Sequence, residues 1–117
     1  MEVWLRKSRI FVLTSESEGL SLSMMEAMRC GLPAIVPRVG DLCELVVEGK
    51  NGHLVNGRTP DEFAARIVEL LSDHLCLDNY SKEARRSTER YALDVVTRLW
   101  DEILESTMKK NVTSCVA

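Results

Sequence analysis

The sequence predicts an α/β fold in which three parallel strands alternate with helices. Three short and mostly apolar runs are typical of strands buried on both faces: residues 10–13, 34–36 and 53–55. Each run is followed by a segment with helical signals, and this alternation forms parallel βαβ units with right-handed crossovers. A length of 117 residues allows one domain with a hydrophobic core and leaves little room for a second.

Helix start signals and apolar spacing place the helices. Thr59 followed by Pro60 is a strong start, because a cap and a proline at the first position precede two acids in the first turn. The apolar residues that follow recur at the spacing of one buried helix face: Phe63, Ile67, Leu70 and Leu71. The predicted helices cover residues 2–8, 22–30, 41–47, a segment from Pro60, 79–90 and 93–109.

The last predicted helix carries an apolar stripe formed by Leu93, Val96, Trp100, Ile103 and Leu104. We expect Trp100 to lie in the core on this stripe, and Trp4 to have the same role near the first strand. His53 is expected to be structural, because no base–nucleophile pair is evident in a chain with two histidines.

Charge and composition exclude several classes of protein. Fifteen Lys and Arg against eighteen Asp and Glu give a net charge of −3, so no nucleic-acid partner is expected. No apolar stretch is long enough to span a membrane, and the N-terminus lacks the apolar core of a signal peptide. Four cysteines without a C-x-x-C pair are expected to be reduced thiols of a cytoplasmic protein: Cys30, Cys43, Cys76 and Cys115.

The functional site is expected at the carboxyl ends of the strands, where open parallel sheets bind their ligands. The loops at these ends are residues 14–20, 37–41 and 56–59, and the first two are the predicted place of the function. The first loop leads into a helix N-terminus, whose free N–H groups and positive dipole end suit a phosphate. Gly19 lets backbone approach such a ligand closely.

Two carboxylates complete this candidate site. Glu18 stands at the mouth of the expected pocket, and Glu26, further along the helix, is placed to accept hydrogen bonds from paired sugar hydroxyls. The pattern therefore suits a phosphorylated sugar. Each of these residues also has a purely structural interpretation, which stays open. Glu26 is then the capping-box partner of Ser23, and Gly19 only marks a turn. Glu16 and Glu18 are then solvated charges of the loop.

Several sequence segments occur together in the order and spacing of one enzyme family. Residues 18–28 carry two glutamates in an E-x7-E pattern, and residues 30–36 are similar to A-G-x-P-V-V. Residues 39–46 are similar to V-G-G-x-x-E-x-V, and residues 49–55 to G-x-x-G-x-L-V. Over residues 9–72 the chain thus resembles the retaining glycosyltransferases of the GT-B fold (family 4, group 1), while residues 73–117 agree only in helical character.

The resemblance implies a Rossmann-like half-sheet: residues 1–117 as part of a C-terminal donor-binding domain, with residues 73–117 as a helical tail. It implies that the donor is a nucleotide-diphosphate sugar and that hexosyl transfer retains the anomeric configuration. It also implies that no metal or other cofactor is needed. These enzymes lack an obvious protein nucleophile, so none is assigned.

The resemblance also implies roles for individual residues. Glu26 would bind the ribose hydroxyls of the donor, and Glu18, the catalytic candidate, would lie near its hexose. Backbone N–H groups of three donor-binding residues would contact the sugar and the diphosphate: Gly19, Leu20 and Ser21. Catalysis would then consist of positioning and of stabilising the charge that develops on the leaving diphosphate.

Some positions depart from the family pattern. Asp41 stands where a second glycine is usual, Cys43 where proline is common, and Ser21 in place of a common glycine. An extra carboxylate near a diphosphate is unfavourable, whereas Ser21 is tolerated if only its N–H is used. The family's diphosphate clamp, an Arg and a Lys, lies further upstream, so its role is not assigned to Arg6, Lys7 or Arg9.

The three strands are similar to strands 4, 5 and 6 of the doubly wound order 3-2-1-4-5-6. The expected partner is therefore a missing N-terminal half or a separate subunit. The open edge at residues 10–13 makes self-association a hypothesis, and peripheral contact with the cytoplasmic face of a membrane is another.

Two functions compete. The first is a glycosyltransferase of which this chain supplies part of the donor site, inactive alone. The second is a non-catalytic module from a truncated or split gene, which binds a nucleotide sugar or a subunit. A response-regulator-like domain is disfavoured, because the strand ends lack an Asp-rich pocket.

Overall fold

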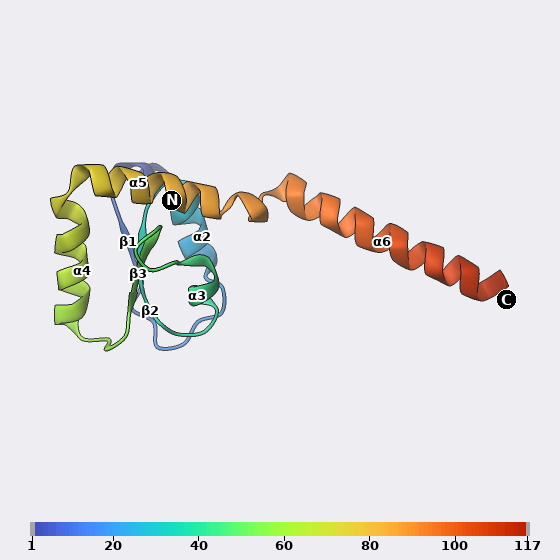
Figure 1. Ribbon diagram of the computed structural model, residues 1–117, viewed down its shortest axis with the longest axis horizontal. Coiled ribbons are helices and arrows are strands. Elements are labelled where there is room, and N and C mark those ends of the chain that lie inside the picture. The colour runs from blue at the N-terminus through green and yellow to red at the C-terminus, as the bar shows by residue number, and fades with distance from the viewer. Residues whose placement is uncertain (1, 117) are drawn as a thin grey trace.

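The predicted parallel sheet is present. The computed structural model describes residues 2–116, with the side chains of residues 3–111. Its three strands are β1 (Phe11–Val12), β2 (Ala34–Pro37) and β3 (Gly52–Val55), all parallel and in the order β1-β2-β3 (Figure 1). β1 is shorter than the predicted strand, although the Leu13 N–H still bonds the Ile35 carbonyl at 3.1 Å.

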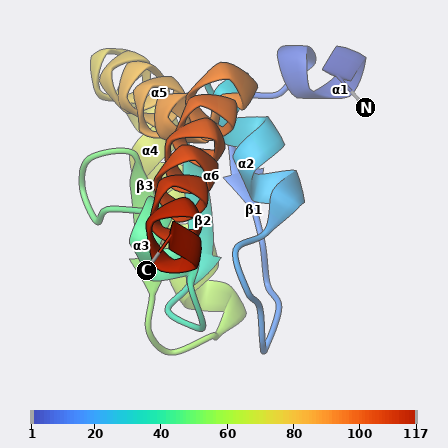
Figure 2. The same cartoon turned by 90° about the vertical axis from the view of Figure 1, so that its right-hand side faces the viewer.

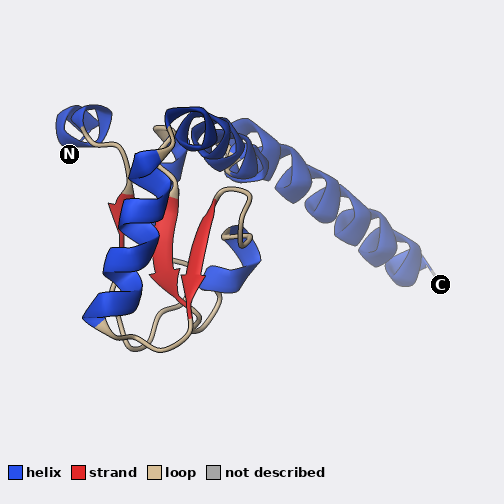
Figure 3. Cartoon of the chain, turned by 60° about the vertical axis from the view of Figure 1, so that its left-hand side comes forward, coloured by secondary structure: helices blue, strands red, loops and turns tan. Residues whose placement is uncertain are grey.

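Helices cover both faces of the sheet. They are α1 (Glu2–Lys7), α2 (Leu22–Arg29), α3 (Leu42–Leu45), α4 (Pro60–Ser72), α5 (His74–Ser87) and α6 (Leu93–Val116), with a short 3-10 helix, η1 (Glu89–Tyr91). Figure 3 shows α4 in front of one face of the sheet. α2 and α3 lie on the other side, and α5 crosses the amino ends of the strands (Figure 1). The layered α/β prediction is confirmed.

The central strand β2 divides the core in two. Ala34 and Val36 point to the side of α2, where they pack with Met24 and Met28. Ile35 points to the opposite side and packs with Phe63 and Leu70 of α4, among others. The predicted buried face of α4 is thus confirmed except at Leu71, which is exposed.

One residue, Asp73, separates α4 from α5, and the sequence pattern does not predict this break. Asp73 ends α4 and caps α5, where its carboxylate accepts hydrogen bonds from the N–H groups of Leu75 and Cys76, both at 3.1 Å. α5 therefore begins at His74, whereas the sequence predicted that this helix begins near residue 79. α5 packs onto both halves of the core, through Leu77 and Tyr80 on one side and Ala84 on the other.

A buried asparagine shortens the third helix. Asn51 accepts a hydrogen bond from the Val47 N–H and donates to the Leu45 carbonyl, both at 2.8 Å. α3 therefore ends at Leu45 rather than at residue 47. A third hydrogen bond, donated by the Asn51 amide to the Ser87 hydroxyl, ties the turn before β3 to α5.

The prediction that both tryptophans lie in the core is wrong. Trp100 is 59% exposed and Trp4 is 74% exposed. α6 extends away from the layered domain (Figure 1), and α1 stands apart from it in Figure 2. The apolar stripe of α6 is consequently exposed except at Val96, which is half-buried. Among residues 2–116, no helix combines the length and the apolar character that crossing a membrane requires.

A charged network holds the start of β3. Glu48 accepts hydrogen bonds from His53 Nδ1 at 3.0 Å and from the Leu54 N–H at 2.6 Å. Arg66 of α4 lies 3.5 Å from the same carboxylate. His53 is buried with its ring 5.4 Å from that of Tyr80, so its predicted structural role is confirmed.

The network changes the acidity of Glu48. Partial burial raises its pKa, but the hydrogen bonds from Leu54 and His53 and the charges of His53 and Arg66 outweigh that effect. The pKa of Glu48 consequently lies below its ordinary value of 4.5. Because the folded state favours the ionised carboxylate, the network contributes stability above pH 4.5 and loses that contribution as the pH falls through the folded pKa.

Replacing Leu70 by alanine should destabilise the protein by about 2–5 kcal/mol, since it leaves a cavity between α4 and β2. The matched control is Leu75→Ala, because Leu70 is 1% exposed and Leu75 is 78% exposed. Urea unfolding followed by circular dichroism measures both. Equal losses for the two variants would contradict the assignment of Leu70 to the core.

Glu48→Gln should lower stability at neutral pH and leave it nearly unchanged below the folded pKa. The stability difference between wild type and variant should therefore shrink as pH falls from about 6 to 3. Urea unfolding at several pH values measures it, with Glu102→Gln on the exposed part of α6 as control. A difference that is constant with pH would show that Glu48 does not act through its charge.

Candidate functional site

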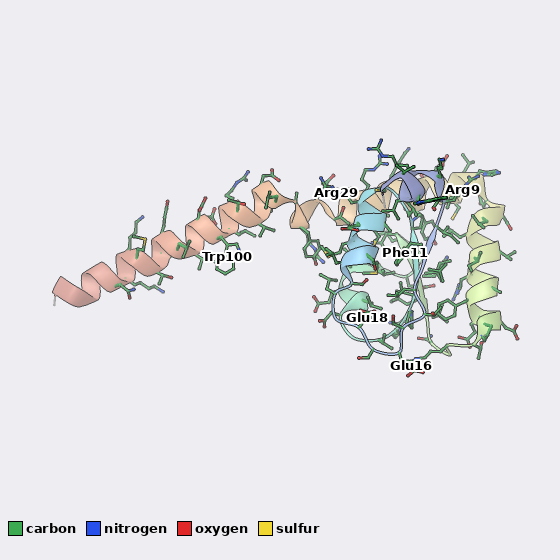
Figure 4. All side chains as sticks on the ribbon, turned by 180° about the vertical axis from the view of Figure 1, so that it is seen from behind. Arg9, Phe11, Glu16, Glu18, Arg29 and Trp100 are labelled. Atoms are coloured by element: carbon green, nitrogen blue, oxygen red, sulfur yellow. The ribbon has the colours of Figure 1, made fainter. Side chains whose placement is uncertain are left out.

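The loops at the carboxyl ends of β1 and β2 contact each other. Figure 4 shows Glu16 and Glu18 at the end of the sheet where the strands finish, opposite Arg9 and Arg29. Gly40, in the loop after β2, lies directly against the backbone carbonyl of Glu18. The structure therefore brings together the two loops that the sequence analysis singled out.

Within the first loop, Glu18 and Glu16 differ. Glu18 is half-buried, and the Ser15 hydroxyl donates a hydrogen bond to its carboxylate at 2.8 Å. Glu16 is exposed, with no bonded partner among residues 2–116. Leu20 packs against the core beneath the loop. The interpretation as a solvated loop charge is thus confirmed for Glu16, whereas Glu18 is held in place.

The start of α2 differs from the predicted capping box. Ser21, 8% exposed, is the N-cap, and its hydroxyl accepts a hydrogen bond from the Met24 N–H at 3.3 Å. Ser23, the predicted cap, is exposed and instead shares a hydroxyl contact of 3.0 Å with Ser21. With the cap at Ser21, Glu26 lies beyond the position from which a capping-box side chain reaches back. The capping-box interpretation of Glu26 is therefore wrong.

Glu26 faces solvent. The inner side of α2 is formed by Met24, Ala27 and Met28, all fully buried, and Glu26 is exposed on the outer side. In the part of the chain that the structure describes, its carboxylate has no hydrogen bond or ion pair. A ligand at this surface would find both oxygens of Glu26 available.

Backbone donors are also available at the start of this helix. No hydrogen bond within the described residues uses the N–H groups of Gly19, Leu20 or Ser21. Gly19 borders open space, since a Cβ added there would have no atom within 4 Å. An anion approaching this loop would therefore meet unpaired donors at a helix N-terminus.

A cavity of about 390 Å³ lies on the α4 side of the sheet, where the third loop meets the first residues of the other two loops. Its lining includes Arg58, Thr14 and Pro37. The backbone of Arg58 is in the left-handed region, with a φ of 56°. Arg38, at the end of β2, donates to the Asn56 side chain at 2.8 Å. Neither arginine is predicted from the sequence, because its spacing along the chain does not show that the ends of the strands bring both residues to this edge.

The basic residues before β1 lie elsewhere. Arg9 is at the opposite end of the sheet from Glu18 (Figure 4), where its guanidinium contacts His74 at 3.2 Å. This position agrees with leaving the diphosphate-clamp role unassigned for this segment.

A family comparison decides the class of protein. The model for glycosyl transferases group 1 matches residues 1–73. The chain belongs to the group 1 glycosyltransferases. The prediction of an enzyme family with the GT-B fold is confirmed.

Alignments with similar proteins cover most of this chain. It is 34% identical over 88 residues to D-inositol 3-phosphate glycosyltransferase 2 of Catenulispora acidiphila, covering 75% of this chain and 21% of that protein. The C-terminal domain of the group 1 protein LpcC from Francisella tularensis aligns with a TM-score of 0.70 at 27% identity, covering 77% of this chain and 47% of that one.

Anabaena HepE, solved in complex with UDP, aligns with a TM-score of 0.81 at 25% identity, covering 88% of this chain and 29% of that one. The glycosyltransferase chain spans between 11% and 25% of the length of the curated relatives that it matches. It therefore corresponds to only a part of those proteins.

Ser21→Ala should destabilise the protein by about 0.5–2 kcal/mol, because the N–H of Met24 loses its cap. Ser23→Ala, an exposed serine on the same turn, should cost much less. Thermal unfolding of the two variants measures the difference. If Ser23→Ala were the more costly change, Ser23 rather than Ser21 would be the cap.

Proposed function

We propose that this chain forms the donor-binding part of a retaining glycosyltransferase, which transfers a hexosyl group from a nucleotide-diphosphate sugar to an acceptor. The supporting observation is that Glu18, three unpaired N–H groups and Glu26 follow one another along one loop and helix. This segment lies at the carboxyl ends of the strands, where parallel sheets bind ligands. Similarity to HepE, which was solved with UDP, supports a nucleotide as ligand.

Glu26 is proposed to bind the ribose. Its carboxylate accepts two hydrogen bonds at once, and the vicinal hydroxyls of a ribose offer two. The exposed position on the outer face of α2 and the absence of a bonded partner in residues 2–116 support this role. A glutamate engaged in a capping box would have been occupied.

Glu18 is proposed as the catalytic residue near the donor's hexose. Its hydrogen bond from Ser15 restricts the carboxylate before any substrate arrives. The N–H groups of Gly19, Leu20 and Ser21 are proposed to contact the sugar and the diphosphate. Donors that are already oriented stabilise the charge developing on the leaving diphosphate without reorganising. The reaction then needs neither a metal nor a protein nucleophile.

Residues 1–117 are proposed to be part of a C-terminal donor domain, in which residues 73–117 continue the chain as helices. Acceptor binding and the diphosphate clamp would then reside in a missing half or a partner subunit, so the chain alone is expected to be inactive. The proposed location is the cytoplasm, where the free thiols of Cys30, Cys43 and Cys76 stay reduced. The side chain of Cys115 lies outside the described residues.

A non-catalytic module is the second candidate. Strand β1 pairs only with β2 within the described sheet, and an unpaired edge of this kind is a site for another strand. A split or truncated protein would use that edge to bind a subunit. Nucleotide binding without turnover, even with the missing half supplied, would favour this alternative.

Glu26→Ala should weaken binding of a nucleotide-diphosphate sugar by about tenfold to a hundredfold, because hydrogen bonds to a charged group contribute about 1.5–3 kcal/mol. The measurement is donor binding by this chain, and donor binding, hydrolysis and transfer by a version completed with the missing half. Glu16→Ala, which changes an exposed glutamate in the loop before α2, is the matched control. Unchanged donor binding and activity in Glu26→Ala would falsify the assignment.

Glu18→Gln distinguishes the catalytic role from donor binding. In the completed enzyme it should lower the rate of transfer by about a hundredfold or more while donor affinity falls much less. Equal losses in affinity and rate would indicate that Glu18 only binds the donor.

A further inference from the structure

We infer that Gly40 is a positioning residue of the donor site, which sets the orientation of the peptide between Glu18 and Gly19. The inference rests on the proposed function, because it concerns the backbone donors proposed to contact the nucleotide sugar. Its observation is the close approach of the two loops at the carboxyl ends of β1 and β2.

The contact involves backbone on both sides. Gly40 has a φ of 53°, and a Cβ added there would overlap the Glu18 carbonyl oxygen and lie 2.9 Å from its carbon. Backbone atoms cannot move aside as the end of a flexible side chain can. Any residue with a side chain at this position must therefore displace the loop that carries Glu18.

The displaced peptide is the one that matters for the ligand. The Glu18 carbonyl and the Gly19 N–H belong to the same planar peptide and point in opposite directions. Because the carbonyl faces Gly40, the N–H of Gly19 points away from the second loop, and no hydrogen bond among the described residues engages it. Gly40 thus directs one proposed donor toward the ligand without touching the ligand.

Both loops are anchored to the same core, so they cannot separate easily. Leu20 of the first loop and Val39 of the second pack against the cluster that includes Leu42. A tight turn brings the Val39 N–H to the Pro37 carbonyl at 2.9 Å and presents Gly40 to the first loop. Strain introduced at Gly40 would consequently rotate or shift the peptide between Glu18 and Gly19.

Gly49 provides a matched control. It also has a positive φ, 77°, but a Cβ there would meet only the Tyr80 hydroxyl, at 3.9 Å. Alanine at either position suffers the backbone strain of the left-handed region. Only alanine at position 40 adds the overlap with the donor loop.

The experiment is a titration of the 15N-labelled chain with UDP, observed by NMR, for wild type, Gly40→Ala and Gly49→Ala. We expect Gly40→Ala to shift the amide resonances of residues 15–21 and to weaken UDP binding about tenfold, as loss of one hydrogen bond to a charged group would. Gly49→Ala should leave both unchanged apart from a loss of stability, which urea unfolding measures separately.

If Gly40→Ala and Gly49→Ala bind UDP equally well while wild type binds, the inference is overturned and the proposed function stands. If wild type binds UDP only when completed with the missing half, the three proteins are compared in that form. If it does not bind UDP in either form, the proposed function fails and the inference falls with it. Should Gly40→Ala not fold, Val39→Ala replaces it, because that variant keeps the glycine and loosens its loop from the core. Val39→Ala should then bind UDP more weakly than Val47→Ala, a half-exposed valine on the adjacent segment, and equal affinities would overturn the inference.

Discussion

The pairing of β2 between β1 and β3 is the interaction on which the rest of the structure depends. β2 is bonded on both edges and buried on both faces, so its residues contact every layer. Ala34 and Val36 bury one side under α2, and Ile35 buries the other under α4. Because parallel strands end at the same edge, this single strand also decides where the loops after β1 and β2 meet.

The two ends of the sheet serve different purposes. At the amino end, α5, Asn51 and the Glu48 network satisfy polar groups and close the core. No buried side-chain nitrogen or oxygen in the described part of the chain lacks a partner. At the carboxyl end, the described residues offer no hydrogen-bond partner to the backbone N–H groups of Gly19, Leu20 and Ser21. These exposed donors lie at the edge where parallel sheets bind ligands.

Sequence periodicity predicted where helices form more reliably than it predicted whether their apolar faces are buried. The apolar stripe of α6 has the spacing of a buried face, yet Trp100 on it is exposed. A helical pattern specifies which residues share a face, but the element that covers that face is encoded elsewhere. The same holds for Trp4 in α1. The chain spans between 11% and 25% of the length of its curated relatives, so covering elements can lie outside these residues.

By itself the sequence determined the fold class, the three strands, the family, the loop that carries Glu18 and the helix that carries Glu26. These follow from local information: runs of apolar residues, Thr59 and Pro60 at a helix start, and motifs in a fixed order. Tertiary structure alone decided that Ser21 rather than Ser23 caps α2, that Asp73 caps α5, and that Gly40 lies against Glu18. In each case several residues are chemically suitable, and packing decides which of them comes within hydrogen-bonding or van der Waals distance. Spacing along the chain does not determine these distances in space.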